Sequence, residues 1–245
     1  MKIFLYDGSF EGLLTCIYES FYTKAPPEWI YNKIDFNEFL LGEVISIATD
    51  TNKFKKVKDG IINKIDPLAF KKIYLVYLSN YKDKEIVILT YLKTAFKLKK
   101  DVHNFLNLDI VRLVDAINKR VSLESHRFEG FIRFNYINDR FLYSAIEPDN
   151  DILELIAEHF KNRFSNEYLI IHDIFRNKAL IYDSKSYEIV PMNIEDYEEL
   201  KNYNDKYTVL WKEYFKSTTI IERKNSKLQK RMMPKRYWKH LVETK

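Results

Sequence analysis

The residues best suited to acid–base chemistry are histidines and an aspartate in the second half of the chain. His159 shares a predicted helix face with apolar residues, and His172 precedes Asp173 in an apolar segment typical of a strand. A helix packed on that strand would bring the two histidines together, and an imidazole beside a carboxylate suits proton transfer. His126, just before another predicted strand, is a fourth candidate. We expect these residues to form either an enzymatic site acting on nucleic acid or a nucleotide, or separate hydrogen-bonded structural histidines.

No familiar motif strengthens an enzymatic interpretation. The HExxH, CxxC and GxSxG patterns and the Walker loop are absent. Glu147, Asp149 and Asp151 resemble a glycosidase carboxylate cluster, but their place at a strand-to-helix turn favours helix capping. The single cysteine, Cys16, excludes an internal disulfide or a multi-cysteine metal cluster within this chain, and its helical apolar setting predicts a buried thiol. We expect no metal and no cofactor in this chain.

The C-terminal stretch interleaves cations with aromatic rings. This pattern allows phosphate contacts together with stacking on bases. We predict that nucleic acid is bound by Arg223, Lys224, Lys227, Lys230, Arg231, Lys235, Arg236, Tyr237, Trp238 and Lys239. The alternative for the tryptophans, Trp211 included, is a role as core anchors.

The formal net charge of +5 is unevenly distributed. Residues 53–100 carry 13 basic and 4 acidic side chains and residues 216–245 carry 10 and 2, whereas residues 101–215 carry 14 and 21. Because Lys and Arg displace counterions from phosphates, the two basic blocks favour a polyanionic partner such as DNA. The alternative is that they are solvated helix faces.

Four further residues are weaker candidates for holding phosphate. A turn between a strand and a helix N-terminus can bind an anion, which points to Ser9 in Asp7-Gly8-Ser9, although the glycines of a dinucleotide site are absent. Arg133, Arg163 and Arg176 lie near the candidate histidines, and guanidinium groups bind phosphate through paired hydrogen bonds.

The elements that must position these residues predict an α+β fold. Apolar spacing predicts strands at 2–6 and 44–48, helices over 10–21 and through the lysine-rich region 53–124, with Asp66 and Asp83 as caps. Strands at 128–137, 141–146, 168–174, 178–182 and 186–190, with a helix at 152–164, predict an antiparallel sheet with packed helices. We expect residues 1–52 and 125–245 to form one α+β body that includes the N-terminal strand–helix unit, and 53–124 to be a helical insert or subdomain.

Several motifs resemble a known family. They are residues 6–15 (YDGSFEGLLT), 126–134 (HRFEGFIRF), 145–148 (AIEP), 159–164, 171–176, 210–215, 222–225, 229 and 233–239. They resemble a bacterial family described as "probable DNA metabolism protein", which gene neighbourhood links to a DNA-repair radical-SAM protein and which is sometimes fused to a uracil-DNA-glycosylase-like domain. The resemblance implies a DNA-metabolism or repair accessory protein that works with a radical-SAM or glycosylase-type enzyme. The sequence holds no glycosylase part, and an iron–sulfur/SAM cofactor would belong to the partner.

Composition and hydropathy place the chain among cytoplasmic globular proteins. Its 245 residues are 46% hydrophobic and 31% charged, no apolar run is long enough to span a bilayer, and the first residues lack a signal peptide's apolar stretch. Three hypotheses follow: a nucleic-acid-binding accessory protein, an enzyme with the His/Asp/Arg site, or a pure protein-interaction module.

Overall fold

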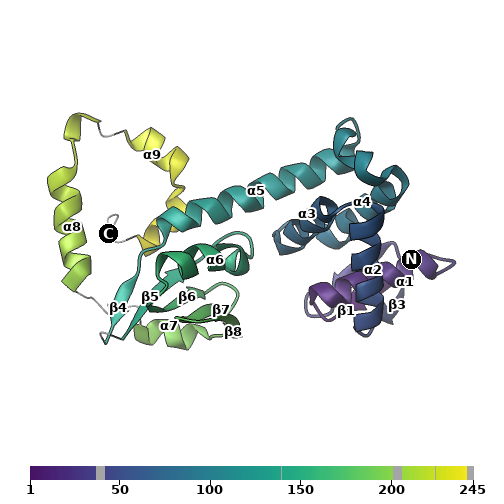
Figure 1. Cartoon of the computed structure of the whole chain (residues 1–245), viewed down its shortest axis with the longest axis horizontal. Helices are drawn as coiled ribbons and strands as arrows, with labels where there is room; N and C mark the ends of the chain where they lie inside the picture. Colours follow the sequence, from purple (N-terminus) through teal and green to yellow (C-terminus); the bar gives the residue numbers. More distant parts are fainter. Residues whose placement is uncertain (37–41, 139, 201–205, 224, 242–245) are drawn as a thin grey trace. The chain divides into compact units, whose positions relative to one another are not determined.

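The computed structural model describes residues 1–36, 42–138, 140–200, 206–223 and 225–241. The chain forms two compact units, Met1–Ser122 (unit 1) and Leu123–Lys245 (unit 2), and the boundary falls within helix α5 (Asp109–Phe131) (Figure 1). The division expected from the sequence joined residues 1–52 to 125–245, whereas the units group residues 1–52 with the helices that follow them.

Unit 1 is built on a parallel sheet in the order β2 (Trp29–Asn32), β1 (Lys2–Tyr6), β3 (Glu43–Ser46). Helix α1 (Phe10–Tyr22) connects β1 to β2 and buries Cys16, as predicted. Parallel neighbours need such a crossover connection. The sequence pattern predicted β1, β3 and α1 but not the short strand β2.

Helices make up the rest of unit 1. They are α2 (Thr51–Lys64), α3 (Pro67–Leu78), α4 (Lys84–Leu98), the 3-10 helix η1 (Lys99–Asn104) and the first part of α5. The Asp66 carboxylate accepts a hydrogen bond from the Ala69 amide with Pro67 in the first turn, as predicted. The cap predicted at Asp83 is wrong, because this residue has a left-handed backbone (φ 57°) and its side chain makes no capping bond.

Unit 2 contains a sheet in the order β4 (Asn135–Ile137), β5 (Phe141–Ile146), β6 (Tyr168–Asp173), β7 (Lys178–Asp183), β8 (Tyr187–Pro191). The pair β5–β6 is parallel, because helix α6 (Leu153–Arg163) carries the chain back to the end of the sheet at which β5 begins. The other pairs are antiparallel. The α+β class is therefore confirmed, but the sheet is mixed rather than antiparallel.

The strand predicted at 128–137 begins later than expected. Residues 128–131 form the last turn of α5, so His126 lies within a helix. Phe128 and Ile132 are spaced four apart and both enter the core, which is helical rather than strand periodicity.

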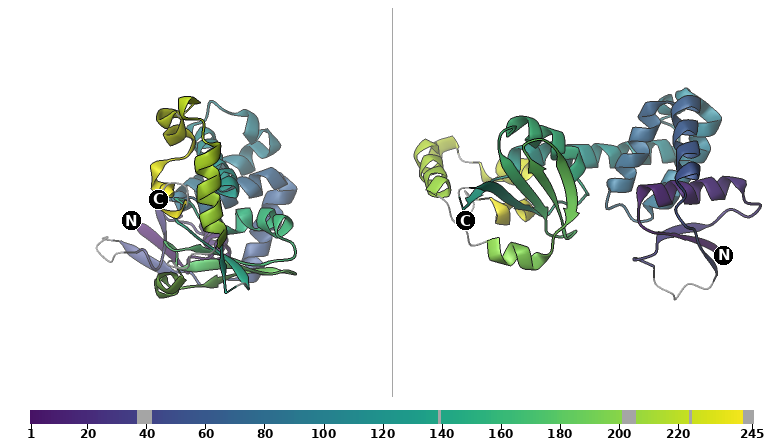
Figure 2. Two further views of the ribbon diagram at one scale, coloured as in Figure 1. Left: turned by 90° about the vertical axis from the view of Figure 1, so that its left-hand side faces the viewer. Right: turned by 60° about the horizontal axis from the view of Figure 1, so that its bottom comes forward.

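The C-terminal segment returns to the core through different residues from those expected. It comprises α7 (Ile194–Leu200), α8 (Lys206–Thr218), η2 (Ile221–Arg223), α9 (Ser226–Met232) and η3 (Lys235–His240) (Figures 1 and 2). Tyr237 is only 4% exposed and packs its ring 4.9 Å from that of Phe128, and Leu241 is also buried. Trp211 is 37% exposed and Trp238 is partly buried, so neither tryptophan is a fully buried core anchor.

Candidate nucleic-acid interface

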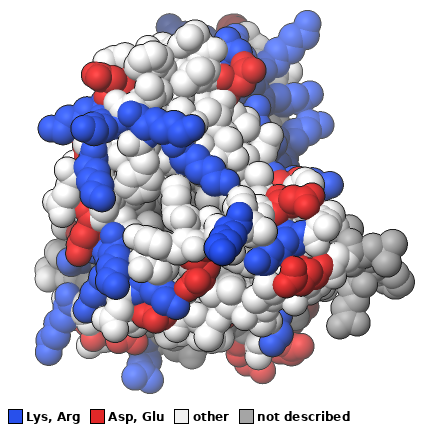
Figure 3. All heavy atoms as spheres, turned by 90° about the vertical axis from the view of Figure 1, so that its right-hand side faces the viewer, with Lys and Arg blue, Asp and Glu red and all other residues white. Residues whose placement is uncertain are grey.

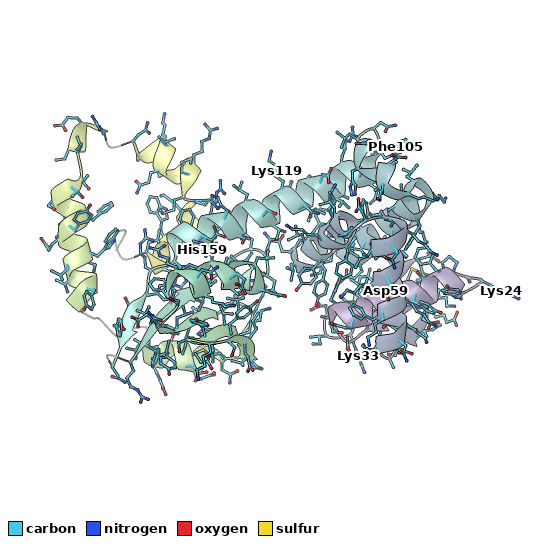
Figure 4. The ribbon with its side chains drawn as sticks, viewed as in Figure 1. Lys24, Lys33, Asp59, Phe105, Lys119 and His159 are labelled. Atoms are coloured by element: carbon cyan, nitrogen blue, oxygen red, sulfur yellow. The ribbon has the colours of Figure 1, made fainter. Side chains whose placement is uncertain are left out.

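Two of the four acid–base candidates meet at one carboxylate of α5. His126 Nδ1 lies 3.1 Å from Glu129 Oε2, and His159 Nδ1 lies 4.0 Å from the same oxygen. Figure 4 labels His159 on α6, where its ring packs edge-on against Phe160. His159 is therefore at a helix–helix contact and does not point into the sheet as the sequence suggested.

The other two candidates have separate partners on β6. His172 is completely buried, with Nδ1 3.0 Å from the Tyr143 hydroxyl and Nε2 3.2 Å from the Met192 carbonyl. Burial lowers the pKa of this imidazole, so it is neutral near pH 7. Asp173 follows it and bonds the Arg176 guanidinium at 2.8 Å. Burial raises the pKa of the Asp173 carboxyl, and the guanidinium opposes that rise. The structure therefore does not bring the four candidates into one hydrogen-bonded site.

The carboxylates that follow β5 bind cations and do not cap α6. Glu147 pairs with Lys239, Asp149 with Arg236, and Asp151 with Lys178. No side chain makes the capping bond at the start of α6. The capping role predicted for this cluster is therefore wrong, because the carboxylates turn toward η3 and β7.

A buried glutamate that was not among the predicted residues organises this region. Glu124 on α5 accepts hydrogen bonds from the amides of Asp149 (2.9 Å) and Asn150 (2.8 Å) and from the Tyr237 hydroxyl. Burial and the nearby Glu124 charge raise the pKa of Asp149, while Arg236 opposes the rise. A lone glutamate in a helical pattern gives no sequence signal for this role.

The predicted nucleic-acid residues differ in their surroundings. Arg236 and Lys239 are paired with carboxylates, and the buried ring of Tyr237 cannot stack on a base. Lys224 lies outside the described residues. The remaining cations are exposed, and within the described part of the chain none has a carboxylate at ion-pair distance: Arg223, Lys227, Lys230, Arg231 and Lys235.

Three of these cations line a hollow of about 680 Å³ between α8, η2, α9 and η3, which we call the C-terminal hollow. Arg223, Lys230 and Lys235 supply the positive charge, and Phe215 and Trp238 supply aromatic walls. The rest of its described lining is threonine, serine, asparagine, glutamine and isoleucine, and none of these described residues is acidic. Hydroxyl and amide groups commonly contact phosphate oxygens beside cations. The hollow can therefore receive an anionic backbone with aromatic rings beside it.

The weaker phosphate candidates lie in three places. Ser9 accepts a hydrogen bond from the Gly12 amide. The Ser9 amide (2.9 Å) and hydroxyl (2.6 Å) both donate to the Asp7 carboxylate. The anion that this turn at the start of α1 binds is therefore the side chain of Asp7. Arg176 holds Asp173 and two backbone carbonyls. Arg133 and Arg163 line a second hollow, of about 440 Å³, in unit 2.

The first basic block lies on the helices of unit 1. Figure 3 shows this unit facing the viewer, with Lys and Arg side chains spread over the face. Lys53 pairs with Glu19 and Lys72 with Asp115, whereas exposed lysines such as Lys55 and Lys64 have no carboxylate at ion-pair distance among the described residues. The block therefore presents positive charge to which a polyanion such as DNA can bind.

Neither a metal site nor a membrane span occurs among the described residues. No three or more His, Cys, Asp and Glu side chains are placed to hold a metal ion there. In the same part of the chain, no helix has the length and apolar character that crossing a membrane requires.

Fold and surface together define an α+β protein with a cationic, aromatic C-terminal segment. Residues 82–243, about two-thirds of the chain, match the family model described as a domain of unknown function (DUF4130), and the chain belongs to this family. No curated protein and no solved structure matches the chain.

Proposed function

We propose that this protein binds nucleic acid through the C-terminal hollow as an accessory protein of DNA metabolism. The observation that carries the proposal is the grouping of Arg223, Lys230 and Lys235 with Trp238 and Phe215 around one hollow whose described lining holds no acidic residue. Cations that track a phosphate backbone, together with rings on which bases stack, are the usual means of holding a single strand.

Cations beside the hollow extend this positive surface. Lys227 and Arg231 are exposed on α9, the helix that supplies Lys230. Because each phosphate contact releases counterions, binding here depends steeply on salt. The exposed lysines of unit 1 offer a further surface for the same polyanion.

The accessory role rests on the resemblance and on exposed apolar residues. The resemblance implies a radical-SAM or glycosylase-type enzyme as partner, which would carry any iron–sulfur/SAM cofactor. Leu210 and Tyr214 lie four residues apart on α8 and are 63% and 58% exposed, and Ile221 on η2 is 77% exposed. Neighbouring exposed apolar side chains are typical of protein-docking surfaces. This segment would hold the partner while the hollow holds the strand.

Fluorescence anisotropy of the full chain with single- and double-stranded DNA across a salt series tests the proposal. The double variant Lys230→Gln/Lys235→Gln should lower the slope of log affinity against log salt by about 2, because each lysine that neutralises a phosphate adds roughly one to that slope. The control Lys161→Gln/Lys185→Gln removes the same charge from α6 and the β7–β8 turn and should keep the slope. Absent or salt-insensitive binding, or an equal effect of the control, argues against the proposal.

A further inference from the structure

The second hollow of unit 2 has walls made mostly of aromatic rings. Its lining comes from the end of α5, the start of the sheet, α6 and α8, and includes Phe134, Tyr136, Phe160, Phe164, Tyr207 and Trp211. We call it the arginine–aromatic pocket. Its volume of about 440 Å³ lies within the range of small-molecule sites, roughly 300–1,000 Å³.

The rings support one another, so the walls are formed before any ligand binds. Phe134 packs edge-on against Phe160 with centroids 5.5 Å apart and against Phe164 at 5.2 Å. Tyr136 lies 6.4 Å from Tyr207 of α8. A pre-formed aromatic slot favours a planar ring over a flexible aliphatic chain, because less ordering is needed on binding.

Two guanidinium groups give the pocket its charge. Arg133 donates to the carbonyls of Gly130 (2.7 Å) and Ile132 (3.3 Å), which orient the group, and it lies 5.5 Å from the Trp211 ring centroid. Arg163 is exposed over the Phe164 ring at 5.5 Å. Among the residues that the structure describes, no Asp or Glu lines this pocket. The pocket is complementary to an anion attached to a flat ring.

We propose that the arginine–aromatic pocket binds one nucleotide, with the base between the aromatic walls and the phosphate on Arg163. A nucleotide joins the two features that the lining offers, an aromatic stacking surface and the exposed guanidinium group of Arg163. The proposal deepens the proposed function and rests on it, since this pocket would hold one unpaired nucleotide of the bound strand. The described linings of the pocket and the C-terminal hollow have no residue in common, so the two can be tested separately.

Calorimetric titration of the full chain with adenosine monophosphate, adenosine and inorganic phosphate tests this inference. Adenosine monophosphate should bind at least about tenfold more tightly than either fragment, because each fragment satisfies one feature only. Arg163→Gln and Trp211→Leu should each weaken binding by about tenfold. Lys161→Gln removes a charge from the same helix outside the lining and should leave the affinity unchanged.

Each contrary outcome is decisive. Absent binding of adenosine monophosphate, equal affinity for adenosine, or no change in Arg163→Gln overturns the nucleotide site. Salt-dependent DNA binding whose salt slope falls by about 2 in Lys230→Gln/Lys235→Gln, combined with any of these results, would leave the proposed function standing and remove only this inference. Binding of adenosine monophosphate without salt-dependent DNA binding would support the pocket and overturn the proposed function.

Discussion

Tyr237 donates its hydroxyl hydrogen bond to Glu124, a residue 113 positions earlier in the chain. The same carboxylate accepts hydrogen bonds from the amides of Asp149 and Asn150 in the loop after β5. One buried glutamate therefore joins α5, that loop and the C-terminal segment within unit 2. The bond fixes η3, from which Lys235 and Trp238 reach the C-terminal hollow.

Tyr237→Phe should lower the free energy of unfolding by about 1–2 kcal/mol. The ring still fills the core and Glu124 keeps the Asp149 amide, but the buried carboxylate loses the Tyr237 hydroxyl and Arg236 loses its hydrogen bond to that hydroxyl. Hydrogen bonds to charged groups contribute about 1.5–3 kcal/mol each, and water can replace the exposed one. Urea denaturation followed by circular dichroism measures the change. Tyr168→Phe is the matched control, because that ring is 56% exposed at the start of β6. An equal loss in the control would contradict the importance of the Glu124 bond.

Arg176→Gln should destabilise the protein more, by about 3 kcal/mol at pH 8, because Asp173 keeps its charge in the interior without its partner. Burial already raises the pKa of Asp173, and removing the guanidinium raises it further. The folded chain then binds more protons than the unfolded chain, whose aspartate has a pKa near 3.9, so stability falls as pH rises through the raised value. The loss should therefore be smaller at pH 5 than at pH 8.

Denaturation of wild type and Arg176→Gln at both pH values provides the comparison. Arg163→Gln is the control, because Arg163 is exposed and has no carboxylate at ion-pair distance in the described part of the chain. A loss for Arg176→Gln that does not change with pH would show that Asp173 is not the group left unpaired.

The sequence predicted those helices and strands whose position is set by neighbouring residues in the chain. Asp66 and Pro67 mark the start of α3, and apolar runs mark β1 and β5 to β8. The parallel pairing of β5 with β6 was missed, because it depends on where α6 delivers the chain and not on the residues of either strand. Phe128 and Phe131 suit a strand as well as a helix, so the sequence predicts a strand where packing against the core gives the last turn of α5.

The candidate interface shows a further limit of sequence reasoning. Lys235 and Arg236 are neighbours in one basic run, yet Lys235 lines the C-terminal hollow and Arg236 pairs with Asp149. The sequence does not distinguish the two cations, because Asp149, which neutralises Arg236, lies far from it in the chain. Tyr237 likewise suited base stacking by type, and only its contact with Phe128 shows that its ring is in the core.

Gly12→Ala in α1 should reduce stability by about 1–3 kcal/mol, although alanine normally favours helices. A Cβ at this position would lie 2.3 Å from Asp7 Oδ1 and 2.8 Å from Thr49 Oγ1, so the bond between those side chains must shift. Gly60→Ala in α2 is the matched control, since its Cβ would meet only the Phe96 ring at 3.9 Å. That variant should gain about 0.5–1 kcal/mol. Thermal unfolding of both variants should give melting shifts of opposite sign, and shifts of the same sign would contradict the close approach at Gly12.

His172→Gln should make the free energy of unfolding depend less on pH below about pH 6.5. Burial lowers the pKa of His172 in the folded chain, whereas the unfolded histidine has a pKa near 6.5. Between the lowered value and 6.5 the unfolded chain binds more protons, so wild-type stability falls as pH decreases below about 6.5, by at most about 1.4 kcal/mol for each pH unit. Glutamine does not titrate, so the difference in unfolding free energy between pH 7.5 and pH 5.5 should be smaller in the variant. His126→Gln, at an exposed position on α5, should keep the wild-type difference. An unchanged difference in His172→Gln would mean that the buried imidazole does not set the acid limit of folding.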